Sequence, residues 1–346
     1  MTAPTIASNG DYDVFAWSTS SDGGTTLSDR AFDFDTEILN NLSLYAKWGI
    51  IATESNVVEK IAAMSESGIV AIKGYASYLT SGILGTVGNE IKKKSFGVGI
   101  DLSGVDGLAS IPSGTFHRCQ NLTSITIPDS VTSIEVQAFH SCSGLTSITI
   151  PGSVMDIGKL AFSDCSGLTS ITIPDSVTSI GEEAFSYCTG LRSVTIPSSV
   201  TIIGKAAFAF CNSLTSITIP CSVTTIGSNA FLLCTGLTSV TIPDSVTSIG
   251  VYAFSECKSL TSVAIPNGVT SIREGSFCNC TSLEITEIPD SITTIERNAF
   301  WHCNSLMNIT FAGTIEQWKK ITKGETWNKN VPATVVVCSD GEVSLN

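Results

Sequence analysis

The stretch LTSITIPDSVTSIGEEAFSYCTG, residues 168–190, decides the fold, because close copies of it fill the chain from about residue 104 to 311. A cysteine recurs every 23 residues, and a phenylalanine stands three residues before each one. A short fixed period of this kind is typical of a solenoid, in which each unit buries its apolar face only against its neighbours. The cysteines, called here the ladder cysteines, are Cys119, Cys142, Cys165, Cys188, Cys211, Cys234, Cys257, Cys280 and Cys303.

One copy already indicates how each unit is built. Its first six residues follow the pattern L-x-x-I-x-I, which is the strand pattern of leucine-rich repeats and points its apolar residues inward. Pro174 ends the strand, since proline has no N–H to donate. Val177 and Ile180 return to the core, Gly181 permits a tight bend, and a short helical turn then leads to Cys188.

The repeat predicts an α/β fold, a leucine-rich-repeat solenoid of about nine 23-residue repeats with parallel strands and helix-containing caps. We expect a partial β-rich module in residues 1–48 and an N-terminal αβ cap in residues 49–103. The solenoid then occupies residues 104–311, and a helix-hairpin cap occupies residues 312–346.

Both caps have recognisable element patterns. Apolar spacing predicts helices over residues 57–64 and 83–91 and strands over residues 69–72 and 98–102. At the other end, Thr314 and Gln317 form a capping-box pattern that opens a short helix. A strand over residues 333–338 and a hairpin turn at Asp340-Gly341 follow.

Charge and hydropathy exclude several classes of partner. The formal net charge is −13, and the longest basic run is Lys92-Lys93-Lys94, so we expect no nucleic-acid partner. No apolar run is long enough for a transmembrane helix, so we expect no membrane insertion, and we expect a monomer. Residues 1–10 have neither the basic nor the apolar region of a secretion signal.

The cysteine ladder could indicate disulfides, metal ligands or apolar filling. Nine is an odd number, and like positions in a parallel stack point the same way, which is poor disulfide geometry. The sequence contains no C-x-x-C pair of the kind that binds zinc, so we expect no metal and no cofactor. We therefore interpret the ladder cysteines as buried, reduced filler, and expect exposed thiols at Cys221, Cys278 and Cys338.

The consensus C-x-x-L-T-S-I-T-I-P-D-S-V-T-S-I-G-x-x-A-F-x-x-C resembles the BspA-like leucine-rich repeats of bacterial surface proteins over about residues 97–311. Departures are local: Glu135, Arg273 and Glu296 replace the bend glycine, and Thr286 replaces a core isoleucine. The segments FAW at residues 15–17, DGGT at 22–25 and LYAKW at 44–48 resemble the back half of a Listeria–Bacteroides repeat.

The resemblance implies a cell-surface or secreted protein of the adhesion type. Its partners would then be host or microbial proteins, such as extracellular matrix proteins or proteins of another cell surface. The front half of the Listeria–Bacteroides-like module is missing, which leaves open an N-terminally truncated chain and makes the missing signal peptide weak evidence against export.

Two surfaces compete as the binding site. The exposed strand columns are almost invariant Thr and Ser, either a surface for weak multivalent contacts or simply good strand residues. The position before each ladder cysteine varies instead, and three consecutive copies are large and apolar there. We name these side chains, with one neighbour, the apolar stripe: Tyr187, Phe210, Leu232 and Leu233. They either form a contact surface or fold back half-buried on the turn.

The remaining polar groups give little support to catalysis. His117 and His140 share one column about 5 Å apart, which favours two surface histidines over a metal pair because no third ligand joins them. Glu284 and Glu287 are the only acidic residues on the strand face, and no second carboxylate pair opposes them, so a glycan-cleaving enzyme is not favoured.

We expect a non-catalytic interaction or adhesion solenoid. The alternative is a structural spacer that displays a domain missing from this chain.

Overall fold

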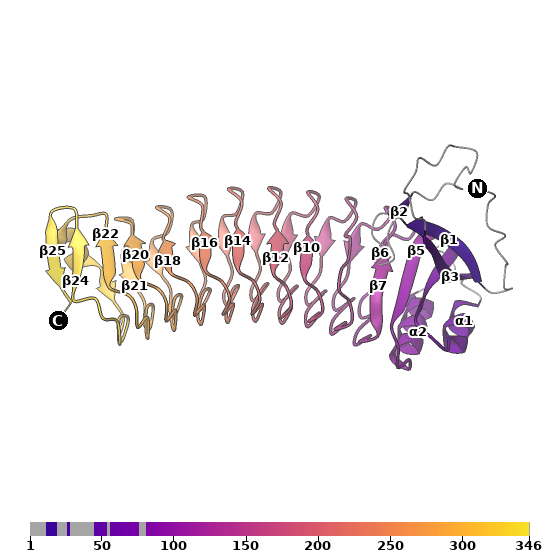
Figure 1. The fold of residues 1–346 in the computed structure, drawn as a ribbon. Coiled ribbons are helices and arrows are strands. Elements are labelled where there is room, and N and C mark those ends of the chain that lie inside the picture. Colours follow the sequence, from indigo (N-terminus) through magenta and orange to yellow (C-terminus); the bar gives the residue numbers. More distant parts are fainter. Residues whose placement is uncertain (1–11, 19–25, 28–44, 54–55, 76–80, 346) are drawn as a thin grey trace, which may run out of the picture.

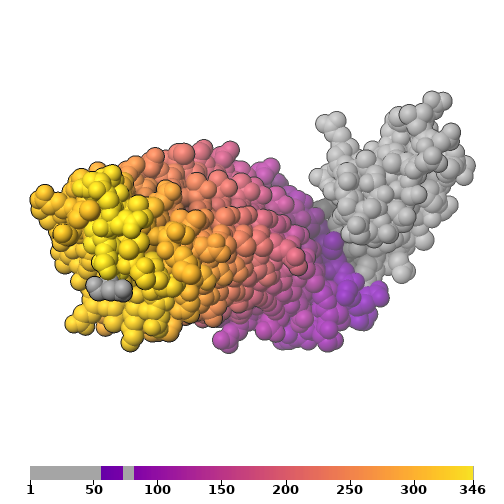
Figure 2. Space-filling view, turned by 60° about the vertical axis from the view of Figure 1, so that its left-hand side comes forward, coloured from indigo at the N-terminus to yellow at the C-terminus, as the bar shows by residue number. Residues whose placement is uncertain are grey.

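In a computed structural model, the chain forms a long stack of similar coils with one cap at each end (Figure 1). The structure describes residues 12–18, 26–27, 45–53, 56–75 and 81–345. The coils follow one another without interruption and give a continuous surface along the stack (Figure 2). The predicted solenoid of parallel strands is confirmed, and its helices belong to the caps within the described residues.

All coils but one contribute a strand to the first row, whose outer surface we call the sheet face; residues 145–150, between β7 and β10, form no strand. Neighbouring strands pair in parallel with like residues opposite each other, as Ile171 lies opposite Val194. The strands are β7 (Leu122–Thr126), β10 (Ser170–Thr172), β12 (Ser193–Thr195), β14 (Ser216–Thr218), β16 (Ser239–Thr241), β18 (Ser262–Ala264), β20 (Ile285–Ile288) and β22 (Asn308–Phe311).

A second row of short strands was not predicted. It arises where the second apolar pair of each repeat, such as Val177 and Ile180, returns to the core, and the paired strands are again parallel and in register. The strands are β6 (Ser110–Ile111), β8 (Ser133–Ile134), β9 (Asp156–Ile157), β11 (Ser179–Ile180), β13 (Ile202–Ile203), β15 (Thr225–Ile226), β17 (Ser248–Ile249), β19 (Ser271–Ile272), β21 (Thr294–Ile295) and β23 (Thr322–Lys323).

The bend glycine has a different purpose from the one expected. The φ of Gly181 lies outside the left-handed range, so conformational freedom is not what the position requires. A Cβ added there would lie 2.6 Å from the carbonyl oxygen of Ile157 in the preceding coil. Glycine therefore allows two coils to approach closely.

The N-terminal end extends the first-row sheet. The strands form the order β2-β1-β3-β4-β5-β7, and the helices α1 and α2 carry the buried side chains Val57, Ile61, Leu84, Val87 and Ile91. The two predicted helices are confirmed. The elements are β1 (Tyr12–Ser18), β2 (Thr26–Leu27), β3 (Tyr45–Thr53), α1 (Val57–Ala63), β4 (Gly68–Tyr75), α2 (Ser81–Lys92) and β5 (Val98–Asp106).

At β3 the chain runs continuously across the boundary expected at residue 48, so the four predicted domain limits stay a proposal. Phe32, Phe34 and the DGGT turn of the predicted β-rich module lie outside the described residues.

The C-terminal cap closes the other end of the core. The predicted capping box at Thr314 and Gln317 is confirmed, and it opens α3 (Ile315–Lys320). Trp318 of this helix packs against Phe311 and Trp327, with ring centroids 5.3 and 6.0 Å apart. The predicted hairpin is formed by β24 (Val335–Cys338) and β25 (Gly341–Ser344), with β24 parallel to β22.

Inside the stack, nine phenylalanines form one column from Phe116 to Phe300. Successive rings are stacked in nearly parallel planes with centroids 5.2–5.7 Å apart, and the nine side chains are fully buried. Trp327 covers the last ring, edge to face. Because each ring stacks only on the rings of adjacent coils, the phenylalanines form a continuous column along the core rather than a central cluster.

Candidate interaction surfaces

The apolar stripe lies on the turn face, the side of the stack that carries the phenylalanine–cysteine turns. Tyr187, Phe210 and Leu233 all have left-handed backbones, with φ of 59°, 63° and 59°. Each N–H donates to a carbonyl of the next coil, at 2.8, 2.7 and 2.9 Å. The turn that was expected to be helical is therefore a left-handed link between coils, and it fixes where these side chains emerge.

The two aromatic rings of the stripe are stacked on each other. Their centroids are 4.1 Å apart, and the ring planes differ by 8°. Tyr187 is 46% exposed, whereas Phe210, Leu232 and Leu233 are half-buried. The two interpretations of the stripe therefore apply to different members of it: one ring projects into solvent and the others partly cover the turn.

One ion-pair network lies close to the stripe in sequence. Lys205, the only charged residue between Arg192 and Asp244, lies 3.0 Å from Glu182, which also pairs with Lys159 at 3.0 Å. Hydrogen bonds from the two lysines hold the pKa of Glu182 below its ordinary value. The network therefore compensates the one charge that lies between Arg192 and Asp244.

Several hydroxyls of the exposed columns have structural partners. Thr238 Oγ1 donates to the carbonyl of Thr215 at 3.1 Å, and Thr261 Oγ1 donates to that of Thr238 at 3.4 Å. These bonds join neighbouring coils along the sheet face. They favour the interpretation that the Thr and Ser columns are exposed strand residues with a structural purpose.

The ladder cysteines are free and buried, as predicted, but they are more than apolar filler. Each thiol donates to a backbone carbonyl of the preceding layer; Cys234 Sγ, for example, donates to the carbonyl of Phe208 at 3.1 Å. Burial raises the pKa of Cys234 to about 12. Among the other three cysteines, Cys221 is exposed as expected, but the expectation was wrong for Cys278 and Cys338, which pack into the stack and are buried.

The two histidines lie together at the start of the array. The ring centroids of His117 and His140 are 5.0 Å apart, and His117 Nε2 and His140 Nδ1 are buried atoms without a hydrogen-bond partner. Burial, assisted by His140, Arg118 and Lys92, lowers the pKa of His117. Within the described part of the chain, no group of three or more metal-ligating residues is found.

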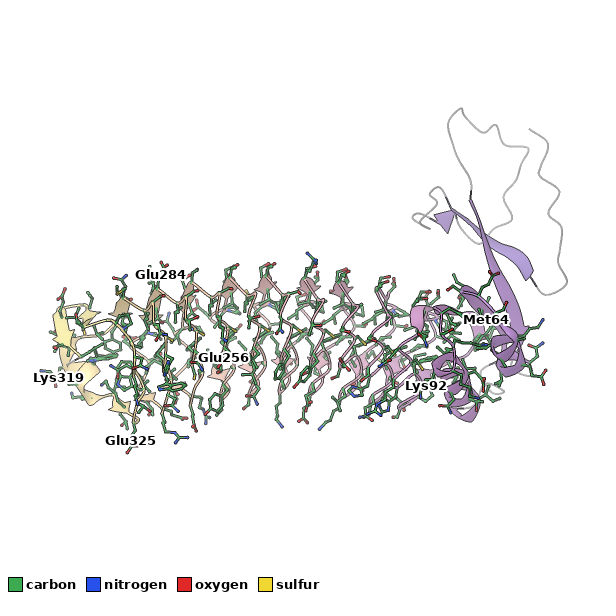
Figure 3. The ribbon with its side chains drawn as sticks, turned by 60° about the horizontal axis from the view of Figure 1, so that its bottom comes forward. Met64, Lys92, Glu256, Glu284, Lys319 and Glu325 are labelled. Carbon is green, nitrogen blue, oxygen red and sulfur yellow. The ribbon has the colours of Figure 1, made fainter. Side chains whose placement is uncertain are left out.

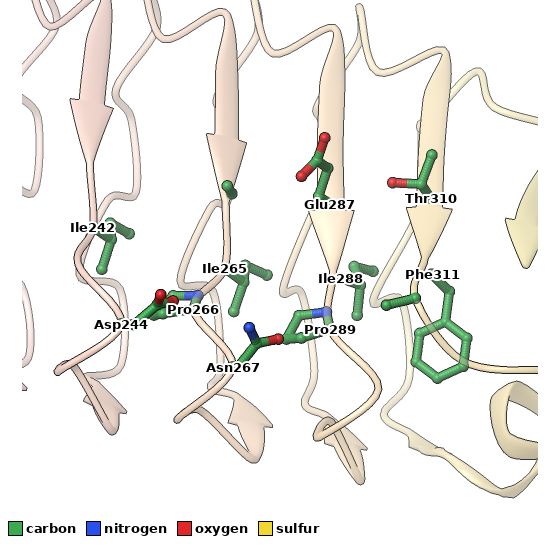
Figure 4. Close-up of a pocket in the computed structure, with 12 residues that line it drawn as sticks. Ile242, Asp244, Ile265, Pro266, Asn267, Glu287, Ile288, Pro289, Thr310 and Phe311 are labelled. Carbon is green, nitrogen blue, oxygen red and sulfur yellow. The ribbon is translucent and has the colours of Figure 1, made fainter. Parts of the chain in front are cut away.

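Sequence analysis missed a hollow near the C-terminal end of the sheet face. It has a volume of about 330 Å³ and lies where β16, β18, β20 and β22 end (Figure 4). Its polar groups come from Asp244, Asn267, Glu287 and Thr310, above a floor that includes Pro266, Pro289 and Phe311. Ala264, which stands where other copies carry threonine, was the sequence signal that could have indicated it.

The fold defines a class of protein: a leucine-rich-repeat scaffold with a strand-lined face and a turn-lined face. A family model described as the BspA type leucine rich repeat region matches residues 109–238 and 224–324, with 6 copies. These matches cover more than half of the chain, which therefore belongs to this family. Among curated proteins, none matches the chain.

A solved structure supports the fold. A leucine-rich repeat protein from Bacteroides ovatus is 25% identical, with a TM-score of 0.51, and the match covers 68% of this chain and 76% of that protein. A leucine rich cell surface protein from Faecalibacterium prausnitzii is 29% identical, with a TM-score of 0.29, and the match covers 62% of this chain and 86% of that one. No helix among the described residues has the length and apolar character to cross a membrane.

Proposed function

We propose that this protein is a non-catalytic adhesion or interaction scaffold, at the cell surface or secreted, that binds a protein partner through the apolar stripe. The observation that carries the proposal is the exposed ring of Tyr187 stacked on the half-buried ring of Phe210. Of the large hydrophobic side chains that are exposed in the described residues, Tyr187 is the one aromatic. Exposed aromatic side chains are typical anchors of protein interfaces.

The fold does not require apolar side chains at these positions. Asp164 and Glu256 occupy the same column as Phe210, with φ of 59° and 62°, close to the 63° of Phe210. The same backbone turn therefore forms with a charged residue. Three consecutive large apolar residues at a tolerant position support a contact surface rather than a packing requirement.

The test compares two double variants of equal added charge. Phe210→Glu with Leu233→Glu changes the stripe, whereas Thr215→Glu with Thr238→Glu changes the sheet face. Binding to immobilised extracellular matrix proteins should fall at least about tenfold, or about 1.4 kcal/mol, with the first variant and persist with the second. Both should stay folded by circular dichroism, since glutamate already occupies the stripe column at Glu256. Loss only in the second variant would contradict the proposal.

The second candidate is a structural spacer that displays another domain. The observation that favours it is the elongated stack, whose core continues from the N-terminal cap to the C-terminal cap (Figure 1). Absence of binding by the folded wild-type protein, unchanged in both double variants, would favour the spacer.

A further inference from the structure

The sheet face changes character at β20. Where most other copies carry Thr, Ser and Thr, this strand and the residue before it carry Glu284, Ile285 and Glu287, all exposed. Figure 3 shows Glu284 at the outer edge of the stack, on the side opposite Glu325. An otherwise uniform surface therefore acquires one segment with its own chemistry.

Apolar side chains continue this segment towards the cap. Ile285 is 44% exposed, Met307 64% and Val337 43%, and they come from successive coils. The Met307 N–H donates to the carbonyl of Glu284, and Thr310 of β22 lies opposite Val337 of β24. We call Glu284, Ile285, Glu287, Met307 and Val337 the terminal patch.

The carboxylates of this region are uncompensated. Glu342 of β25 lies opposite Val337 and adds a third exposed carboxylate beside the terminal patch. Among the described residues, none of Glu284, Glu287 and Glu342 takes part in an ion pair, whereas Glu182 and Glu274 elsewhere are both paired. Like charges gathered on one surface produce a negative potential that attracts cations.

The hollow beside Glu287 suits a long cationic side chain. Its volume of about 330 Å³ lies within the usual range of small binding pockets. Ile265, Ile288 and the two prolines supply apolar walls, and Asp244 and Glu287 supply carboxylates. Lysine and arginine lay their aliphatic stems on such surfaces and keep the charged head beside acidic groups.

The core beneath the terminal patch also departs from the repeat. Thr286 occupies a position that is Ile or Val in the other copies, and it is fully buried. Its Oγ1 has no hydrogen-bond partner within the described structure. A strand that breaks the repeat both outside and inside is the kind of local inconsistency that is expected at functional positions.

We propose that the terminal patch is a second docking surface, for a segment of a partner protein that presents lysine or arginine next to aliphatic side chains. It goes beyond the proposed function because it lies on the other face of the stack and selects its partner by charge. Carboxylates beside exposed Ile285 and Met307 match a segment of that mixed chemistry, and the hollow receives one cationic side chain.

The test measures binding of a short fluorescent peptide of alternating lysine and leucine to the full chain by anisotropy. Glu284→Gln with Glu287→Gln should weaken binding at least about tenfold. The matched control, Glu59→Gln with Glu66→Gln, removes the same charge from exposed residues of the N-terminal cap and should change binding less than about twofold. A peptide with glutamine in place of lysine should not bind.

A second variant distinguishes loss of the binding surface from loss of the fold. Glu284→Thr, Ile285→Ser and Glu287→Thr together restore the residues that other coils already carry, so the stack should remain intact by circular dichroism and peptide binding should be lost. Equal weakening by the control pair would show general electrostatic attraction and overturn the proposal. Undiminished binding by either terminal-patch variant would also overturn it. A rise in melting temperature with calcium that only the terminal-patch variants lose would indicate a metal-ion site and overturn it as well.

The proposal for the apolar stripe and the proposal for the terminal patch can be tested independently. Phe210→Glu with Leu233→Glu should leave binding of the lysine-leucine peptide within about twofold of wild type, because the stripe lies on the turn face. Loss of peptide binding in a folded form of this variant would place the cationic segment on the stripe and overturn the terminal patch.

Discussion

Thr286 shows how a single hydroxyl can lower stability in a repeat. Its side chain is fully buried and unpartnered, so Thr286→Val should raise the free energy of unfolding by about 1–3 kcal/mol. Valine already occupies the opposite position, Val263, in the neighbouring strand. Urea unfolding measures the change, and Thr172→Val on the exposed face should give less than about 0.5 kcal/mol. Destabilisation by Thr286→Val would show that the hydroxyl has a partner in solution.

The ladder thiols make stability depend on alkaline pH. Burial raises the pKa of Cys234 from 9.0 to about 12 in the folded chain. The unfolded thiol ionises first as pH rises, so stability is fully present below about pH 9 and falls as pH rises towards 12. In that window each such thiol lowers the free energy of unfolding by up to about 1.4 kcal/mol per pH unit. Urea unfolding between pH 9 and 12 should show that the free energy of unfolding falls with pH. Cys234→Ala should make this fall less steep, because one fewer proton is released on unfolding.

At this scale the sequence predicted the burial of the repeated columns, but not that of Cys278 and Cys338, and not what the buried groups do. The period alone placed the phenylalanine and cysteine columns in the core. The bond from each thiol to a carbonyl of the preceding layer depends on how two coils are spaced, which a single repeat does not contain. The left-handed φ at Phe210 was equally hidden, because the column accepts charged, polar and aromatic residues alike.

The phenylalanine column should dominate the stability of the coils as elements. Phe208→Ala removes a fully buried ring that stacks on Phe185 and Phe231, so it should cost about 3–5 kcal/mol of unfolding free energy. Phe210→Ala, two residues away and half-buried, should cost less than half as much. Urea unfolding of the two variants makes the comparison, and equal costs would contradict a core confined to the inner column.

Helices could be predicted where the apolar spacing is long or where specific capping residues mark the first turn. The amphipathic spacing of α1 and α2 and the capping box of α3 were enough to place those helices. The second row of strands is two residues long in each coil, too short for alternation to be recognised. The sequence showed Glu284 and Glu287 of the terminal patch as the acidic residues of the strand face, but not the exposed Met307 and Val337 that continue it from later coils.

The molecule as a whole should tolerate the loss of one complete repeat. Deleting residues 168–190 joins Gly167 to Leu191 and preserves the repeat frame, so the shortened chain should fold. Its urea m-value should fall by roughly a tenth, since less surface is exposed on unfolding. Deleting only residues 168–179 breaks the frame and should disrupt the stack by circular dichroism. A folded half-repeat deletion, or an unfolded full one, would contradict neighbour-only packing.

The stacking of coils at 5.2–5.7 Å has a mechanical consequence. A coil peeled from one end shortens the stack by a single ring spacing but releases 23 residues of chain, roughly 75 Å when extended. Because each coil is held only by its neighbours, a pull on the two ends releases them one after another. Under tension the protein becomes an extensible tether that lengthens in equal steps.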